Sequence, residues 1–423
     1  MTGSTPHAAP AVGSRTVAAP AIPAGIRTPA YVLDAARLDA NLATAARIKR
    51  ETGCTLLLAT KAFAFIAAFP RMRDVLDGST ASGLYEAWMG RDDFGKQVHV
   101  YAPAYTEAEL TELTGFAKHI YFNSPAQLAR YLPLVRRTPG IHVGLRVNPG
   151  YSMATLGGPL YDPCAPGSRF GATRDTLDAA PWDDIDILHV HALCEATADG
   201  SAGLIAHVAR ELGPYVRRVK AVNFGGGHFV NRAPYNVDKL IAAVNAFKAE
   251  FGVEVILEPG AGLVVDTGYL VSTVLDLHRN GENIAILDAS ASCHMPDVLE
   301  VPYTPPVYGA VAIPDASAGS SGFESSGSES SVAGSAGPAP GAPNRYILAG
   351  NTCMTGDIIG TYAFDKPLRP GDRIVFGDMM QYSFVKNNTF NGQPLPDLAV
   401  LEPDGTYRVV KTFGYEAFRD RLG

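Results

Sequence analysis

The feature that most constrains the fold is a regular alternation of short apolar runs with longer, helix-like stretches between residues 28 and 268. Eight runs precede a change of character near Tyr269: Leu56–Thr60, Gly78–Ser82, Val98–Ala102, His119–Asn123, Ile141–Asn148, Ile185–His191, Val219–Phe224 and Val253–Glu258. Runs of this length, separated by helical stretches, predict parallel strands joined by crossover helices. Eight such units predict an α/β domain that closes as a (β/α)8 barrel of the TIM type.

Helical periodicity fills the gaps between several of these runs. A stretch that begins at Asp34 repeats apolar residues every three or four positions, and so does another from about Val237 to Phe251. A barrel of this type carries its chemistry at the carboxyl ends of its strands. The polar or glycine residues that end or follow the runs are therefore the candidate site: Lys61, Arg146, Asn148, His191, Gly225, Gly226, Gly227 and Glu258.

The helical spacing stops after about Tyr269, and the rest of the chain is strand-like. Apolar runs separated by Gly, Pro, Asp and Asn predict a second, mostly β domain at 269–423. A Ser/Gly/Ala/Pro-rich tract at about 316–343 is too polar to offset the entropy of ordering it, so we expect a disordered insertion. The Ala/Pro/Gly-rich residues 1–27 are expected to be a disordered leader.

Composition excludes several classes of partner. The formal net charge of −7 disfavours binding of nucleic acid but tolerates a polycationic substrate. No apolar stretch approaches the length of a membrane span. The five cysteines are odd in number and lack paired spacing, which favours reduced thiols and a cytoplasmic location over a disulfide frame or a zinc knuckle.

Lys61 ends the apolar run after Cys54 and is followed by Ala62-Phe63-Ala64-Phe65-Ile66. An amine in an apolar surround has its ammonium form disfavoured, which makes it available as a nucleophile for a carbonyl group. A lysine that marks the strand end and extends to water is an equally good reading of this pattern alone.

Two further strand ends have both functional and ordinary readings. In Asn223–Phe229, Gly225, Gly226 and Gly227 allow backbone N–H groups to surround a phosphate, although a simple glycine turn also fits. Glu258 is either a carboxylate directed at a cofactor ring or one partner of a surface ion pair.

His189 and His191 lie two positions apart on a predicted strand, so both point to one face. They could chelate a metal ion, or one ring could lie flat against a planar cofactor. The later histidines do not complete a ligand set of the usual spacing, which disfavours metal. Cys353, in a glycine-flanked polar loop, could exchange a proton near neutral pH, but isolated cysteines are more often inert.

Taken in chain order, these elements and Asp378–Tyr382 resemble the fold type III pyridoxal-phosphate decarboxylases, which act on ornithine, diaminopimelate and arginine. The resemblance covers residue 28 to the C-terminus, without the insertion. It implies that Lys61 carries pyridoxal 5′-phosphate through a Schiff base. It further implies the following roles: His191 stacks on the ring, Gly225, Gly226, Gly227 and Tyr382 hold the phosphate, and Glu258 pairs with the ring nitrogen.

The same resemblance implies a homodimer with a shared active site, in which Cys353 crosses the interface and reprotonates the carbon that has lost carbon dioxide. It suggests Asp288 and Asp357 as acids that bind the distal amine of the substrate. Glu195 is a further candidate for that role, as are Asp297 and Glu300.

Within this group, four segments resemble the carboxynorspermidine/carboxyspermidine decarboxylases of polyamine biosynthesis: Leu193–Glu195, Cys293–Val298, Leu348–Cys353 and Phe390–Gly392. Where the amino-acid decarboxylases usually have His-x-Gly-Ser and Glu-Pro-Gly-Arg, this chain has His191-Ala192-Leu193-Cys194 and Glu258-Pro259-Gly260-Ala261. The resemblance therefore predicts decarboxylation of a carboxylated polyamine. The alternatives are a decarboxylase of diaminopimelate, ornithine or arginine, an alanine-racemase-like enzyme, a non-catalytic regulator with this fold, and a metal-dependent hydrolase.

Overall fold

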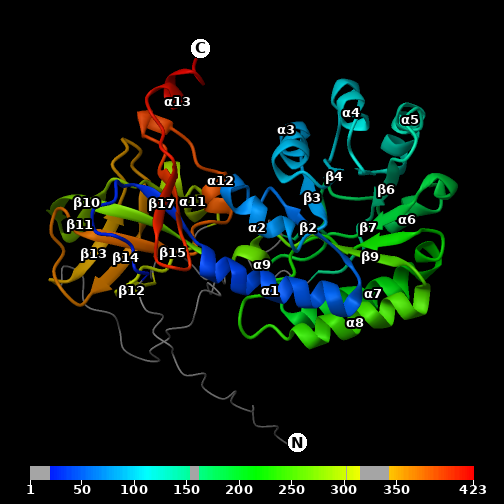
Figure 1. Cartoon of the computed structure of the whole chain (residues 1–423), viewed down its shortest axis with the longest axis horizontal. Helices are drawn as coiled ribbons and strands as arrows, with labels where there is room; N and C mark the ends of the chain where they lie inside the picture. The colour runs from blue at the N-terminus through cyan, green and yellow to red at the C-terminus, as the bar shows by residue number, and fades with distance from the viewer. Residues whose placement is uncertain (1–19, 153–161, 302, 315–342) are drawn as a thin grey trace, which may run out of the picture.

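The computed structural model describes residues 20–152, 162–301, 303–314 and 343–423. It consists of two bodies side by side, a barrel wrapped by helices and a β-rich body to which both ends of the described chain return (Figure 1). The barrel holds the candidate site, and its strands come from the first two-thirds of the chain.

Eight parallel strands close the barrel in the order β2-β3-β4-β5-β6-β7-β8-β9. Their bounds are β2 Thr55–Ala59, β3 Gly78–Ala81, β4 Gln97–Tyr101, β5 His119–Phe122, β6 His142–Arg146, β7 Ile187–His189, β8 Ala221–Asn223 and β9 Glu254–Leu257. Each falls within or beside one of the eight apolar runs, so the predicted (β/α)8 barrel is confirmed. The runs are one or more residues longer than most strands because the apolar pattern continues into the turns.

The two helices expected from periodicity are also present. Helix α1 (Ala35–Thr52) begins at Asp34, whose side chain accepts a hydrogen bond from the Arg37 N–H, and ends at Gly53 with φ of 61°. Helix α8 (Val237–Phe251) has the predicted bounds. The remaining helices of the barrel are α2 Phe69–Arg73, α3 Leu84–Met89, α4 Glu107–Thr114, α5 Pro125–Val135, α6 Arg174–Leu177, α7 Ala198–Val216 and α9 Ala261–Val264. Helices α7 and α8 pack side by side against the barrel (Figure 1).

The second body is a nine-stranded sheet in the order β12-β14-β13-β11-β10-β1-β16-β17, with β15 paired to β10. Its strands are β1 Ala30–Asp34, β10 Gly268–Asn280, β11 Glu282–Leu287, β12 Ala310–Ile313, β13 Arg345–Ala349, β14 Ile358–Phe364, β15 Arg373–Gly377, β16 Asp397–Leu401 and β17 Tyr407–Lys411. Short helices α10 Ala291–His294, α11 Asp297–Glu300, α12 Tyr382–Val385 and α13 Glu416–Arg419 accompany it. The mostly β character expected of this part of the chain is confirmed.

Strand β1 connects the two bodies in an unexpected way. It lies within the range 28–268 that the sequence assigned to the barrel, yet it pairs antiparallel with β10 and parallel with β16 of the sheet. The chain therefore contributes a strand to the second body before it enters the barrel. Its alternating side chains bury both faces, with Ala30, Tyr31, Val32 and Leu33 at 1% exposure or less.

Most of the predicted leader and insertion lie outside the described residues. Residues 20–27 of the leader are described, and they contact the sheet: Ile26 is buried, and its carbonyl accepts a hydrogen bond of 2.7 Å from Arg373. Among the helices of the described chain, none is long and apolar enough to cross a bilayer.

Candidate active site at the carboxyl end of the barrel

A cavity of about 660 Å³ opens at the carboxyl ends of the barrel strands. Its wall is built from residues at or just after the ends of strands β2, β3, β4, β6, β7, β8 and β9, from the segment 162–170, and from Tyr382 at the start of α12. Its polar lining includes Lys61, Ser82, Tyr101, Arg146, Asp162, His191, Cys194, Glu195, Glu258 and Tyr382, with the backbone of Gly226 and Gly227. Concave sites of this size hold small ligands and cofactors.

Lys61 lies in the turn that follows β2 and is open to the cavity. Its pKa is lowered, first because protein surrounds the ammonium group and second because the Arg146 guanidinium brings a like charge. Glu258 and Glu86 oppose this shift without cancelling it. Lys61 therefore loses its proton more readily than a solvated lysine does, and the neutral amine is the nucleophilic form.

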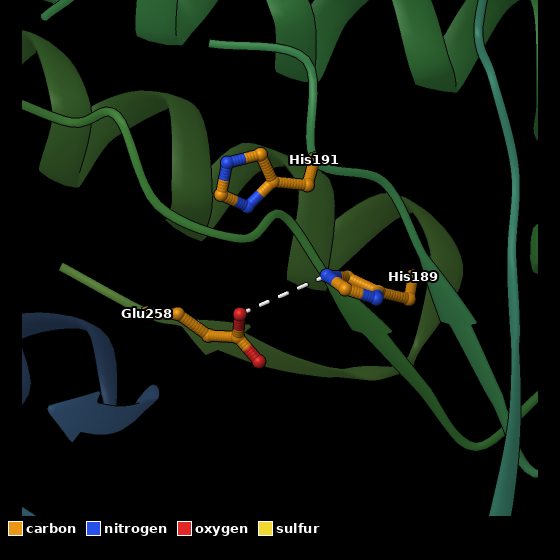
Figure 2. Close-up of side chains that lie close together, drawn as sticks. All are labelled: His189, His191 and Glu258. Atoms are coloured by element: carbon orange, nitrogen blue, oxygen red, sulfur yellow. Dashed lines mark ion pairs between the residues drawn. The ribbon is translucent and has the colours of Figure 1, made fainter. Parts of the chain in front are cut away.

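Glu258 directly follows β9 and is 4% exposed. One oxygen accepts a hydrogen bond of 2.7 Å from Asn223, and the other lies 3.7 Å from the His189 ring, which is directed at the carboxylate (Figure 2). Burial raises the pKa of Glu258, whereas the Asn223 hydrogen bond and the charge of Lys61 lower it. The carboxylate is therefore desolvated, and neighbouring groups partly compensate for the loss of water.

The glycine segment after β8 packs against the end of β7. Gly225 and Gly227 have φ of 68° and 85°, a region that side chains rarely adopt. A Cβ atom on Gly226 would lie 2.7 Å from the Glu258 carbonyl oxygen, so this close approach requires glycine. The Gly226 N–H donates to His191 Nδ1 at 3.1 Å, which leaves the proton of the neutral ring on Nε2. Burial lowers the pKa of His191 well below its ordinary value.

Cys194 and Glu195 follow β7 and are exposed within the cavity. Glu195 has φ of 44°, a strained conformation for a residue other than glycine. Strain of this kind concentrates at functional positions, and here it places a carboxylate beside the cavity. Tyr382, at the start of α12, brings a phenol from the other body, and burial raises its pKa.

Arg146, at the end of β6, supplies a second cation to the cavity. Its guanidinium carbon lies 4.5 Å from the ring centroids of both Tyr101 and Phe170, and its Nη2 donates to the His191 carbonyl at 3.1 Å. Burial lowers its pKa. Two aromatic faces offset part of this desolvation and fix the guanidinium in place.

Asp288, Asp357 and Cys353 do not reach this cavity within the described chain. Asp288 accepts hydrogen bonds from Thr28 Oγ1, Ser272 Oγ and Thr273 N inside the sheet, at 2.6 to 2.8 Å. Asp357 is buried and accepts from Ser290 and Thr352. Both carboxylates are satisfied by the β body itself.

Cys353 is exposed on the loop that follows β13, and its N–H donates to Asn391 Oδ1 at 2.7 Å. Cys293 reaches the same region, because its thiol donates to the Phe390 carbonyl at 3.4 Å. Three motif segments far apart in the sequence thus meet at one place on the β body. Cys353 is exposed there and does not line the described cavity of its own chain.

Comparison with known proteins places the site in a family. A family model described as "Pyridoxal-dependent decarboxylase, C-terminal sheet domain" matches residues 30–380. The chain belongs to the pyridoxal-dependent decarboxylases. Members of this family are carboxy-lyases that use pyridoxal phosphate, which agrees with the activity and cofactor implied by the sequence motifs.

Curated relatives of this decarboxylase include two enzymes at 37% identity. Carboxynorspermidine/carboxyspermidine decarboxylase of Campylobacter jejuni aligns over 93% of this chain and 98% of its own length. Carboxyaminopropylagmatine decarboxylase of Synechocystis aligns over 94% and 95%. Diaminopimelate decarboxylase of Deinococcus radiodurans is more distant, at 24% identity over 87% of this chain and 89% of its own.

Among solved structures, too, the carboxynorspermidine decarboxylase is more similar to this chain than the diaminopimelate decarboxylase. Carboxynorspermidine decarboxylase of C. jejuni, complexed with norspermidine, superposes with a TM-score of 0.82 at 35% identity, covering 94% of this chain and all of the other. Diaminopimelate decarboxylase of Helicobacter pylori has a TM-score of 0.76 at 15% identity, with 94% and 98% covered. The second likeness supports the fold alone.

The residues of the cavity fit pyridoxal phosphate. They include an amine for its aldehyde, a buried carboxylate for its ring nitrogen, an imidazole, and backbone N–H groups of glycines that leave room for a phosphate. His189, His191 and Glu258 each place one possible ligand atom within 4.8 Å of the others (Figure 2), a geometry that by distance alone also suits a metal ion. Family membership favours the cofactor for these positions.

Most predicted cofactor residues therefore meet in one place. Lys61, His191, Gly226, Gly227, Glu258, Tyr382 and Glu195 line the cavity, and Gly225 adjoins them through the hydrogen bond from Glu258 N to its carbonyl. The sequence pattern placed Arg146 at a strand end but predicted no role for it. It did not predict that Asn223, Tyr101 and Asp162 belong to the site. The alternation of side chains along β8 could have found Asn223, because Asn223 lies on the same side of the strand as Ala221, which points into the barrel.

Proposed function

We propose that this enzyme removes the α-carboxylate of carboxynorspermidine or carboxyspermidine and forms norspermidine or spermidine. The observation that carries the proposal is the 37% identity over nearly the whole of both chains with the C. jejuni enzyme, supported by the fit to its norspermidine complex. The cavity agrees with this substrate class, since Glu195 and Asp162 offer carboxylates beyond the cofactor residues.

The predicted cofactor residues would then each have a defined task. Lys61 binds the cofactor aldehyde, Glu258 holds the proton on the ring nitrogen, and His191 packs on the ring face. The backbone of Gly225–Gly227 and the Tyr382 hydroxyl bind the phosphate, which this chain does without the arginine common at position 261. The bound cofactor supplies the electron sink that accepts the pair left when carbon dioxide departs.

Glu195 is the acid that we assign to the polyamine arm. Of the five acids proposed from sequence, it alone lies in the lining of the described cavity. Its carboxylate would pair with a secondary or distal ammonium group of the substrate, and its strained backbone holds it beside the cavity. Asp288 serves as a matched control because it sits in a hydrogen-bond network away from the cavity.

We further propose a homodimer in which Cys353 of one protomer enters the cavity of its partner. The support is the exposure of Cys353 and the absence of a Cys353-loop residue from the described cavity lining. In that arrangement the thiol donates its proton to the carbon that lost carboxylate, and the thiolate then recovers a proton from water. Equal mixing of Lys61→Ala and Cys353→Ala subunits would restore about a quarter of the wild-type sites, since half the dimers carry one intact site.

A cytoplasmic location remains part of the proposal. All five cysteines are unpaired, which agrees with a reducing compartment. The absence of a nucleic-acid partner likewise stays a prediction, based on the net charge.

The substrate experiment compares kcat/KM of the purified holoenzyme for carboxynorspermidine, carboxyspermidine, carboxyaminopropylagmatine and diaminopimelate, with products identified by mass spectrometry. We expect the two carboxylated triamines to lead. Glu195→Gln should raise their KM about tenfold or more with a smaller change in kcat, whereas Asp288→Asn should leave KM unchanged. Release of carbon dioxide from diaminopimelate alone would contradict the proposal.

One second candidate deserves the same assay. The Synechocystis carboxyaminopropylagmatine decarboxylase is as similar to this chain as the C. jejuni enzyme, at 37% identity. Its substrate name indicates a guanidinium at the distal end in place of an ammonium, and either cation can pair with a carboxylate. A higher kcat/KM for carboxyaminopropylagmatine than for both triamines would select this alternative.

A further inference from the structure

The barrel interior beneath the cavity is unusually polar. Interiors of such barrels are filled mainly by branched aliphatic side chains. Here the strand registers align His99, His119 and His142 in one row across β4, β5 and β6, and they align Tyr101 with Tyr121 in the next row toward the cavity. The proposed mechanism uses none of these side chains, although Tyr121 is linked to Glu258 through Asn223.

A hydrogen-bond chain joins this polar interior to Glu258 through Asn223. The Asn223 Nδ2 group lies 2.7 Å from Glu258 Oε1 and 3.0 Å from the Tyr121 hydroxyl oxygen. Its Oδ1 accepts from the Gly225 N–H at 2.8 Å. Because a backbone N–H can only donate, this third contact fixes which end of the amide is oxygen and directs both N–H groups at Glu258 and Tyr121.

The direction of the remaining bonds follows from that assignment. The Tyr121 oxygen accepts from Asn223, so its own proton is free to be donated to His99 Nδ1, 3.1 Å away. The other nitrogen of His99 then carries the proton and faces Gln97 Oε1 at 3.4 Å. All three side chains are fully buried: Asn223, Tyr121 and His99. Bulk water therefore cannot replace any of these hydrogen-bond partners.

We propose that Asn223, held in place by Tyr121 and His99, is a positioning residue that fixes the Glu258 carboxylate toward the cofactor ring. An amide suits this task because it donates to a carboxylate and carries no charge that would compete with the ring nitrogen. Tyr121 and His99 prevent the amide from turning, since each has its polar atoms already committed. The inference rests on the proposed function, in which Glu258 faces that nitrogen.

The test compares two cofactors on the apo-protein: pyridoxal phosphate and its analogue in which carbon replaces the ring nitrogen. Only the first can form the ion pair with Glu258, so the ratio of their dissociation constants isolates that contact from all others. We expect wild type to prefer pyridoxal phosphate and Glu258→Gln to lose most of this preference. Asn223→Asp keeps the acceptor for Gly225 but turns the donor into a second carboxylate, and it should lower the ratio at least about tenfold.

Tyr121→Phe provides a second, nearly isosteric variant should Asn223→Asp fail to fold. It removes the hydroxyl that restrains the amide, and we expect the ratio to fall about threefold. Tyr362→Phe is the matched control, since its buried hydroxyl donates to the Pro305 carbonyl at 2.7 Å in the other body. That control should leave the ratio unchanged.

The outcomes separate the two proposals. If Glu258→Gln leaves the ratio at the wild-type value, the proposed contact between Glu258 and the ring fails, and the positioning role fails with it. If Glu258→Gln lowers the ratio but Asn223→Asp and Tyr121→Phe do not, the positioning role alone is overturned. Equal weakening of both cofactors in these two variants would indicate a purely structural role and would also overturn it.

Discussion

The two sides of the barrel strands differ in chemistry even within a single strand. In β5, Ile120 and Phe122 point outward to the helices, whereas His119 and Tyr121 point into the barrel. The outward side chains join one large apolar core, and the inward apolar cluster is confined to Leu57, Tyr121, Ile187, Ala221 and Ile256. Stability thus depends mainly on one face of the strands, and the cofactor chemistry depends on the other.

We expect the largest effect at Lys61, which lies in the turn after β2 and is open to the cavity above the inward face. Lys61→Ala should lower turnover at least about 10⁴-fold, because it removes the amine that we propose binds the cofactor aldehyde. The unfolding free energy of the apo-protein should change by no more than about 0.5 kcal/mol. Steady-state assays and denaturant unfolding measure the two quantities, and either residual turnover near wild type or a large loss of stability would break the contrast.

Phe122→Ala tests the outward face of β5. Its ring is fully buried and lies 5.9 Å from Tyr105 and 6.4 Å from Tyr131, centroid to centroid. Truncation should reduce the free energy of unfolding by about 3–5 kcal/mol, while kcat of the remaining folded enzyme stays near wild type. A stable variant with impaired kcat would show that outward positions also shape the site.

Gly144→Ala tests how tightly the inward face is packed. A Cβ at this position would lie 2.2 Å from Tyr121 Cδ1, so the ring would have to move. We expect destabilisation by about 1–3 kcal/mol and a shift of the Tyr121 hydroxyl away from Asn223. In a Tyr121→Ala background the same change should cost much less, and additive effects in this double-mutant cycle would contradict the contact.

The inward face also controls the pH dependence of stability. Burial lowers the pKa of His119 to about 3, with the charges of His142 and Lys118 acting in the same direction and Asp186 opposing them. A histidine of ordinary pKa near 6.5 takes up a proton in the unfolded chain first, so its contribution to stability is complete above about pH 6.5 and is lost as the pH falls toward 3. His119→Gln should flatten the acid limb of apo-protein stability by about 1.4 kcal/mol per pH unit.

Denaturant unfolding of wild type and His119→Gln between about pH 6 and 4 gives the two slopes of unfolding free energy against pH. Equal slopes would mean that burial in the barrel has no special effect on proton binding at this position.

The fold was largely predictable because its strongest signals are local. Apolar runs of strand length, alternating with amphipathic stretches such as Ala35–Thr52, predicted each strand of the barrel. Strand β1 was missed because Ala30–Asp34 is short and continues directly into α1, while its partners Gly268–Asn280 and Asp397–Leu401 are remote in sequence. Pairing of this kind leaves no periodic signature near the strand itself.

The site was predictable where a residue ends a strand and uncertain where a role depends on tertiary placement. Lys61, His191 and Glu258 follow apolar runs, and the barrel brings such positions together. Asp288 also ends an apolar run, yet the sheet satisfies its carboxylate with Thr28 and Ser272. Asn223 looked like the last residue of a strand, and only its contacts with Glu258 and Tyr121 distinguish it.

The place of β1 between β10 and β16 has a consequence for biosynthesis. Ala30–Asp34 leaves the ribosome before the other strands of the described chain, but one lateral neighbour of this segment, Asp397–Leu401, is translated only after the whole barrel. The segment must therefore wait with an unpaired edge while the whole barrel is made, and such edges recruit foreign strands. We expect stalled or truncated products that lack Asp397–Leu401 to depend on chaperones.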